Sequence, residues 1–275
     1  YENLNNNYKS IEYYKRAYEI EPKPLYLNNV AVTFSSLINN YDSALFYFRL
    51  SKELFPEYVD TYAKEAHAHS LFQEYDKAIE QYSKFIDTSN DFQSEQGLTT
   101  TEILISRAFI YQNDLQEYEN AMNDFDKAIS LDPEDQNIYY HKINLLQIMN
   151  DTKSAKNLAY ETIDMNLDDP QGYYILAEIF FSNGEIIDAF ENIIISESKL
   201  ARDENYFITN LDGDIKELYE LYFFKADIAK KLNLDELYCE SMIEASILFN
   251  NSENKKDEKK YLKKLDIFNN YNLCD

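Results

Sequence analysis

The sequence of 275 residues contains no Trp, only 4 Gly and 5 Pro, and no apolar run near the ~18 residues of a membrane-spanning helix. So few Gly and Pro residues cannot supply the many turns of a β-sandwich or β-barrel. The two cysteines, Cys239 and Cys274, lack the spacing of a metal or redox site, and we expect free thiols. There is also no Gly-rich phosphate loop, no nucleophile motif and no cluster of metal ligands. The sequence therefore predicts no enzyme, no cofactor and no metal site.

The charge of the chain is strongly one-sided, with 50 Asp and Glu against 26 Lys and Arg and a formal net charge of −24. This charge disfavours binding to nucleic acid or to an anionic membrane, because like charges repel. The chain starts at Tyr1 rather than Met, so we expect the natural N-terminus to lie upstream. A signal peptide or lipid anchor there stays open, as does the compartment, although a soluble protein of the bacterial cytoplasm fits these features.

The hydrophobic pattern is helical and repeats along the chain. Tyr173, Leu176, Ala177 and Phe180 share one helical face, and Gly184 is placed to end that helix in a left-handed conformation. The same face recurs in five other segments, namely 27–34, 62–69, 104–111, 139–146 and 222–229. A second helix follows each of them. Three of these helices open with a Tyr, have an Ala three residues later, and have an aromatic ring one turn after that Ala.

The period of this pattern is 34 residues, which separates Pro22 from Pro56 and Pro133 from Leu167. With this period and the segment Ala-Ile-Ser-Leu-Asp-Pro at 128–133, the chain resembles the tetratricopeptide repeat family over nearly its whole length. The resemblance implies an all-α fold, an α-solenoid in which antiparallel helix pairs stack into a right-handed superhelix. The sequence departs from the family in opening its first helices with Tyr or Leu in place of Trp. Four units also carry a charged residue directly before the small one, namely Glu65, Arg107, Lys142 and Lys225.

We expect one solenoid over residues 1–275 that begins within a repeat and ends with a capping helix. The predicted units are a partial repeat at 1–22, repeats near 25–56, 59–90, 101–133, 136–167, 170–201 and 214–249, and a cap at 254–270. The predicted helices are 25–38, 41–54, 59–72, 75–88, 101–115, 118–131, 136–149, 152–165, 170–183, 186–201, 214–232 and 235–249. Two segments, 91–99 and 202–213, break the period and are either binding loops or tolerated surface insertions.

The family resemblance implies that a peptide binds in the concave groove lined by the first helices. The predicted peptide-binding residues follow the opening aromatic by one, two or five places. They are Asn28, Asn29, Lys64, His67, Ser106, Phe109, Tyr140, His141, Asn144, Tyr174 and Glu178. These places carry no Asp or Glu before Glu178, which favours an uncharged or carboxylate-bearing peptide. The alternative is that neutral residues only avoid crowding of like charges in a narrow channel.

Two further groups of residues are open to alternative interpretations. Tyr174, Phe181, Phe223 and Phe224 form either an aromatic wall for apolar side chains or contacts with the adjoining loop and the terminal helix. Six lysines between 255 and 264 form a basic stripe that docks an acidic partner, folds back on the body or is solvated. In the last case we expect Leu262, Leu265 and Phe268 to pack inward. His69 takes the place of an aromatic residue, and we expect it in the core.

The sequence thus predicts a scaffold or adaptor that binds a peptide segment of a protein partner. Two alternatives remain: a structural or self-associating subunit without a groove ligand, and the regulatory domain of a longer enzyme whose catalytic part lies before Tyr1.

Overall fold

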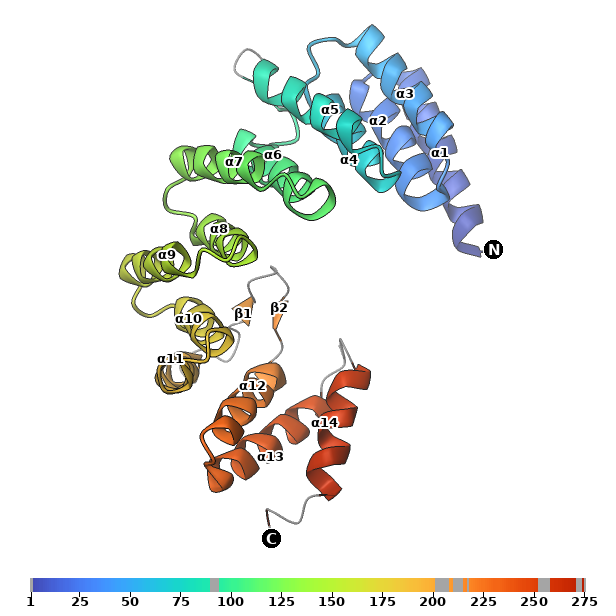
Figure 1. Ribbon diagram of the computed structural model, residues 1–275. Coiled ribbons are helices and arrows are strands. Elements are labelled where there is room, and N and C mark those ends of the chain that lie inside the picture. Colours follow the sequence, from blue (N-terminus) through green and yellow to red (C-terminus); the bar gives the residue numbers. More distant parts are fainter. Residues whose placement is uncertain are drawn as a thin grey trace. The chain divides into compact units, whose positions relative to one another are not determined.

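The computed structural model describes residues 2–89, 94–200, 208–209, 215–216, 218–251, 258–270 and 274, and these fold into two compact units. Unit 1 comprises residues 1–138 and unit 2 comprises residues 139–275, with the boundary in the first turn of helix α8. Both units are built from antiparallel helix pairs, as the sequence predicts (Figure 1). Each unit is described below by itself.

Unit 1 begins with α1 (Glu2–Ile20), which packs against the first helix of the next pair. Its helix pairs are α2 (Pro24–Val32) with η1 (Thr33–Ile38) and α3 (Tyr41–Leu54), then α4 (Asp60–Leu71) and α5 (Tyr75–Thr88), then α6 (Thr100–Phe109) with η2 (Ile110–Leu115) and α7 (Tyr118–Leu131). The segments η1 and η2 are π-helical ends of the helices predicted at 25–38 and 101–115. All six predicted helices of unit 1 are therefore confirmed to within one residue at each end.

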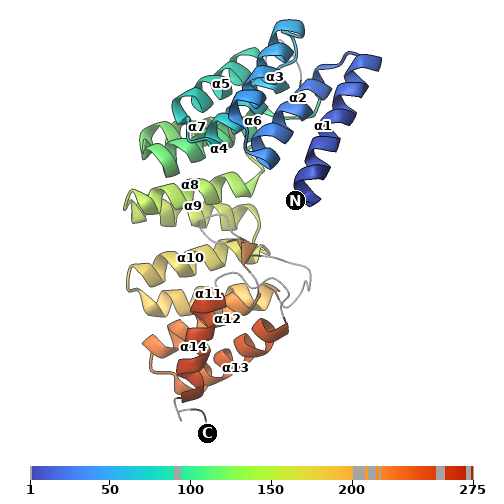
Figure 2. The same cartoon turned by 90° about the vertical axis from the view of Figure 1, so that its right-hand side faces the viewer.

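Unit 2 contains α8 (Gln136–Ile148) and α9 (Thr152–Met165), α10 (Pro170–Ser182) and α11 (Ile186–Leu200), α12 (Leu218–Lys231) and α13 (Asp235–Asn251), and the terminal α14 (Glu258–Asn270). In Figure 2 the pairs α8–α9 and α10–α11 lie one below the other with their axes nearly aligned. Between α11 and α12, strands β1 (Ile208–Thr209) and β2 (Ile215–Lys216) pair antiparallel, with Ile208 opposite Lys216. The predicted start of α12 at residue 214 is therefore wrong, because strand β2 occupies residues 215–216.

Helices end where the sequence provides a left-handed residue. Gly184 has a φ of 80°, and the next amide, that of Glu185, donates to the Phe180 carbonyl at 2.9 Å, which closes α10 as predicted. Five other first helices end on a non-glycine residue with positive φ, namely Asn39, Gln73, Gln116, Asn150 and Asn233. Asn tolerates this conformation better than most residues, because its short side chain bonds locally. The chain therefore makes these turns with very little glycine.

The core of each unit alternates small and aromatic side chains. In unit 1, Ala44 and Phe48 are fully buried in one second helix, and Ala121 and Phe125 in another. The small residue lets the neighbouring helix approach, and the ring one turn later fills the remaining space. In unit 2, a cluster of Tyr219, Phe223, Phe249 and Tyr261 joins α12, α13 and α14. Aromatic rings fill the cores of a chain without Trp, as the composition predicts.

The predicted free thiols are wrong, because Cys239 and Cys274 form a disulfide. The Cα atoms of the two residues are 5.6 Å apart, although 35 residues separate them in sequence. Helix α14 packs against α13, and the C-terminal end of the chain thereby returns to the first part of α13. Spacing in the sequence carries no information about this proximity, because it depends on how α13 and α14 fold together.

Candidate functional site

Four of the predicted peptide-binding residues are buried, and their assignment is corrected here. Asn28 is completely buried and donates its amide to the Thr61 hydroxyl of α4 at 2.9 Å. Tyr140 is 4% exposed and donates to the Asp169 carboxylate at 2.6 Å. Asn144 and Tyr174 are 6% and 2% exposed. Asn28, Tyr140 and Tyr174, each one place after the opening residue of its helix, thus face the interior rather than solvent, and Asn28 bonds the next first helix.

The other predicted residues keep access to solvent. In unit 1, His67 is exposed, whereas Asn29, Lys64, Ser106 and Phe109 are half-buried. We call these five residues the first-helix surface of unit 1, because they lie on α2, α4 and α6. In unit 2, His141 on α8 and Glu178 on α10 are half-buried as well. The contacts of these residues with a peptide remain predictions.

Lys64 is the cation at the centre of the first-helix surface. Its ammonium makes no ion pair with any residue among those that the structure describes, and it is half-buried on α4. Burial lowers the pKa of Lys64 below its usual value, and the negative charge of Asp60, one turn earlier, opposes this effect. A desolvated lysine without a carboxylate partner favours a ligand that supplies one.

The insertion predicted at 91–99 is anchored next to Lys64. Residues 90–93 lie outside the described part, but residues 94–97 form a turn that binds Asp60, a fully buried carboxylate. Asp60 accepts hydrogen bonds from the Ser94 hydroxyl at 2.5 Å and from the backbone amides of Glu95 and Gln96 at 3.1 and 3.2 Å. Asp60 and Lys64 are four residues apart and share a face of α4, so this turn borders the first-helix surface.

The aromatic residues predicted as a wall divide between the two interpretations. Phe224 contacts Tyr174 and Phe181 edge to face, with ring centroids 5.7 and 5.3 Å apart. Phe223 instead points into the core and stacks on Tyr261 of α14, with centroids 4.7 Å apart. Three of the four rings therefore gather between α10 and α12, while the fourth contacts the terminal helix.

The basic stripe of α14 folds back in part on the body of unit 2. Lys264 donates to the Asp227 carboxylate of α12 at 2.5 Å and lies over the Phe223 ring. Leu265 is buried as predicted, but Leu262 is 43% exposed, so its predicted inward packing is wrong. Tyr261 takes the inward position instead. Of the lysines in the stripe, 255 and 256 lie outside the described residues.

Three of the four charged residues before the small position form ion pairs that are largely buried, a role that sequence reasoning missed. In unit 1, Glu65 pairs with Lys52 of α3, and Arg107 makes a two-pronged bond to Asp124 of α7 with both distances 2.7 Å. In unit 2, Lys225 donates to Glu197 of α11 at 2.6 Å. We call the contact between a first helix and the second helices beside it, where these ion pairs lie, the seam of a repeat. A charge on an otherwise apolar face was the only indication of these pairs in the sequence.

His69 lies in the core of unit 1 as predicted. It is 4% exposed, and its Nδ1 is 2.7 Å from the Tyr41 hydroxyl. Burial lowers the pKa of His69 to about 4, and the positive charges of Lys77 and Lys52 act in the same direction. The imidazole is therefore neutral at physiological pH and acts as a packed, hydrogen-bonded core residue.

These helix pairs and their sequence pattern point to one family. A sequence profile described as tetratricopeptide repeat matches residues 1–24 and 101–135. The second match covers one complete helix pair, from α6 through η2 to α7, with Ala108 and Ala121 fully buried in its contact. These two segments of the chain are tetratricopeptide repeats by sequence. No curated protein sequence is significantly similar to the chain.

Solved tetratricopeptide repeat structures share the fold at low identity. The C-terminal part of a TPR repeat-containing protein from Cytophaga hutchinsonii has a TM-score of 0.63 at 13% identity and covers 91% of this chain and 93% of its own. A tetratricopeptide repeat protein from Parabacteroides merdae has a TM-score of 0.56 at 17% identity, covering 97% and 98%. PilW, a type IV pilus biogenesis factor, has a TM-score of 0.56 at 16% identity, covering 84% and 95%. These similarities establish the fold.

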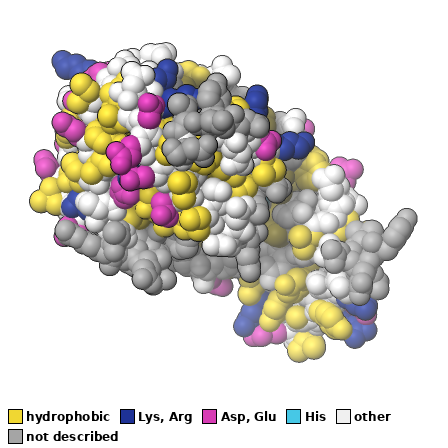
Figure 3. All heavy atoms as spheres, turned by 90° about the horizontal axis from the view of Figure 1, so that it is seen from below, with side chains coloured by type: hydrophobic (Ala, Val, Ile, Leu, Met, Phe, Trp, Pro, Cys, Tyr) yellow, Lys and Arg dark blue, Asp and Glu magenta, His cyan; other side chains and the backbone are white. Residues whose placement is uncertain are grey.

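The chain thus has the fold of tetratricopeptide repeat proteins, a class that generally serves as protein-interaction scaffolds and is generally not enzymatic. In the face seen in Figure 3, acidic and basic side chains lie interspersed among hydrophobic ones. No described helix is both long and apolar enough to cross a membrane.

Proposed function

We propose that this protein is a scaffold or adaptor of a multiprotein assembly and that the first-helix surface of unit 1 binds a peptide segment of a partner. The observation that carries the proposal is Lys64. It is half-buried and has no ion-pair partner in the described residues of a chain whose net charge is −24. The other polar residues of this surface, Asn29, His67 and Ser106, also have access to solvent.

The chemistry of this surface suits a peptide that is largely uncharged and carries one carboxylate. Lys64 supplies the cation for the carboxylate, and the side chains of Asn29 and Ser106 offer hydrogen bonds to a peptide backbone. A multiply acidic peptide is disfavoured by the net charge of the protein. A single carboxylate in contact with Lys64 is favoured, because salt screens exposed charges beyond ~8 Å at physiological ionic strength.

The turn at residues 94–97 supports a defined peptide position. Asp60 holds this turn on the face of α4 that also carries Lys64, one helical turn away. A buried carboxylate with three hydrogen-bond donors fixes the turn firmly. The turn would then border the first-helix surface on one side and limit how a peptide enters it.

The test is to compare a short uncharged peptide with a free C-terminal carboxylate and the same peptide with an amidated C-terminus. Peptides are first selected on an array and then titrated calorimetrically. We expect the free acid to bind about tenfold more tightly, because a charge-assisted hydrogen bond is made only by the carboxylate. We also expect this preference to disappear in Lys64→Glu.

Lys127→Glu is the matched control, because it makes the same change of charge at an exposed lysine of α7 in the same unit. Equal affinity of Lys64→Glu and Lys127→Glu for the free acid would overturn the proposed site. His141→Glu tests separately whether α8 of unit 2 takes part. A protein that captures no peptide and only associates with itself would support a structural subunit instead.

A further inference from the structure

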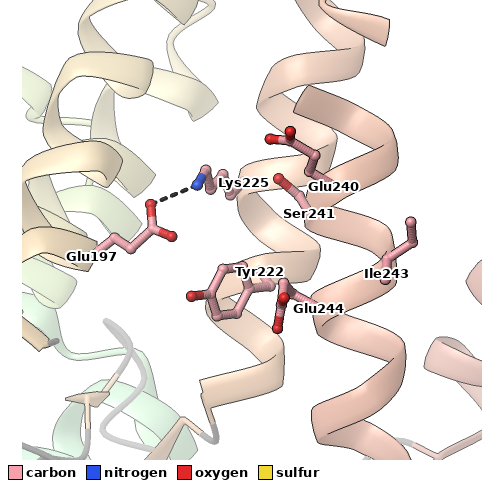
Figure 4. A pocket seen from close by; sticks show the side chains of 7 residues that line it. All are labelled: Glu197, Tyr222, Lys225, Glu240, Ser241, Ile243 and Glu244. Carbon is pink, nitrogen blue, oxygen red and sulfur yellow. Dashed lines mark hydrogen bonds and ion pairs between the residues drawn. The ribbon is translucent and has the colours of Figure 1, made fainter. Parts of the chain in front are cut away.

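Unit 2 contains a cavity of about 470 Å³ at the seam of its α12–α13 pair. The cavity lies between the first helix α12 and the second helices α11 and α13, none of which carries the proposed peptide site. It is lined by Glu197, Tyr222, Lys225, Glu240, Ser241, Ile243 and Glu244. Figure 4 shows Lys225 and Ser241 side by side, with Glu197 reaching toward Lys225 from the opposite helix.

The cavity exists because the seventh residue of α13 is short. The seventh residues of α5 and α7 are Gln81 and Asp124. Gln81 contacts the ion pair of its seam, and Asp124 is itself a member of the ion pair of its seam. Gln81 accepts from Lys52 at 3.4 Å, and Asp124 binds Arg107. In α13 this place is taken by Ser241, which forms no bond to Lys225 and leaves space that longer side chains fill in the other two seams.

Ser241 presents an unsatisfied polar group to this space. The residue is 2% exposed, and its hydroxyl oxygen has no hydrogen-bond partner in the described residues. Buried hydroxyl groups normally find a partner, and a serine within a helix commonly bonds the carbonyl four residues earlier. Ser241 lacks even that bond. A ligand that reaches into the cavity would supply the missing partner.

The charge of the cavity selects the sign of such a ligand. Lys225 and Glu197 neutralise each other through their 2.6 Å bond. Glu240 and Glu244, one turn apart on the exposed side of α13, make no ion pair in the part of the chain that the structure describes. Burial raises the pKa of the Tyr222 hydroxyl to about 12, and the charges of Glu197 and Glu244 contribute. Two uncompensated carboxylates therefore favour a cation.

We propose that this cavity binds an arginine side chain of a partner protein. A guanidinium carries five N–H donors in a planar fork, so it can serve the Ser241 oxygen and the two rim carboxylates at once. A lysine ammonium is more strongly hydrated and lacks this fork. The site is separate from the proposed peptide surface of unit 1 and would give the scaffold a second contact through α11, α12 and α13.

The test uses the full chain and two short neutral-capped peptides that differ in one residue, arginine or its uncharged isostere citrulline. Amide chemical shifts of the labelled protein report binding. We expect saturable shifts in α12 and α13 with the arginine peptide and about tenfold or more weaker binding of the citrulline peptide. Equal effects of the two peptides, or no saturable shift with arginine, would overturn the proposal.

Three variants locate the site. Ser241→Gln introduces the residue type found at position 81, so we expect a filled cavity, an unchanged or higher melting temperature and loss of arginine binding. The double variant Glu240→Gln with Glu244→Gln should weaken binding about tenfold or more, since it removes both uncompensated charges. Glu236→Gln is the control, because it removes an exposed carboxylate of α13 outside the cavity. Full arginine binding by a folded Ser241→Gln protein would contradict the proposal.

The arginine site and the peptide surface of unit 1 can fail independently. Lys64→Glu lies in unit 1 and should leave the binding of the arginine peptide unchanged. Ser241→Gln should in turn leave unchanged the preference of the protein for a free peptide carboxylate. Loss of both activities in either folded variant would contradict two separate sites.

Discussion

Removing Arg107 should destabilise unit 1 strongly. Its guanidinium donates two bonds of 2.7 Å to Asp124 and one of 2.6 Å to the Ser83 hydroxyl. Asp124 is only 2% exposed. The variant Arg107→Met keeps the apolar stem but leaves the carboxylate buried without a cation. We expect a loss of about 3–5 kcal/mol in the free energy of unfolding, as for other broken buried ion pairs.

The estimate agrees with the bonds that are lost. Hydrogen bonds to charged groups contribute about 1.5–3 kcal/mol each, and Arg107 makes two of them to Asp124. The double variant Arg107→Met with Asp124→Leu removes both charges at once. It should recover most of the lost stability, because no unpaired charge then stays in the interior. The cost of the single variant thus measures the stranded carboxylate rather than the net value of the pair.

Hydrogen–deuterium exchange is the suitable measurement, because repeat proteins do not always unfold in one step. The amides of α6 and α7 report the local free energy, and those of unit 2 serve as an internal reference. Lys84→Met is the matched control, since Lys84 forms an exposed pair with Glu80 in the same unit at 2.6 Å. Exposed pairs contribute little to stability. If Arg107→Met lost no more protection than Lys84→Met, the reasoning about the buried seam would be refuted.

Three further predictions concern stability. Ala177→Leu should cost about 1–3 kcal/mol by overpacking a fully buried helix contact, and an unchanged thermal melt would contradict the assigned register. The pKa of His69 is lowered from 6.5 to about 4 in the folded protein. As the pH falls below 6.5, the unfolded chain therefore takes up a proton at His69 before the folded protein does. The contribution of His69 to the free energy of unfolding is thus complete above pH 6.5 and is lost as the pH drops toward 4. Melting temperatures of His69→Phe should lose this slope, and a slope equal to that of the parent would exclude His69 as its source. Cys239→Ser opens a loop of 35 residues closed by Cys274 and should cost about 3–4 kcal/mol, measured as exchange protection of α14 against the oxidised parent.

The helices could be predicted from the sequence because each depends on local spacing. An apolar face every three to four residues and a left-handed residue at the end define a helix without knowledge of its neighbours. The start of α12 was missed for the same reason, since strand β2 pairs with β1, whose paired residues lie six and eight positions upstream. The disulfide and the inward turn of Tyr261 in place of Leu262 likewise depend on how α14 meets α13.

The candidate site was predicted less well, because the helical period does not determine which residues at the border of a helical face are covered by the neighbouring helix. Asn28 and Asn29 are neighbours on α2, yet Asn28 is completely buried and Asn29 keeps access to solvent. The helical period places both near the groove side, but the distance to α4 decides which of them is covered. That distance is set by the pair of Asn28 with Thr61, which no pattern within α2 contains.

The charged residues before the small positions can determine which helix pairs stack on each other. Lys52 is the twelfth residue of α3 and binds Glu65, whereas Glu197 is the twelfth residue of α11 and binds Lys225. The two seams therefore have the same positions and opposite polarity. If the α12–α13 pair stacked on α3, Lys52 would face Lys225, and two like charges would be buried together at a cost of several kcal/mol. These two repeats thus differ in the sign of the charge at equivalent seam positions, and this difference favours a single order of stacking.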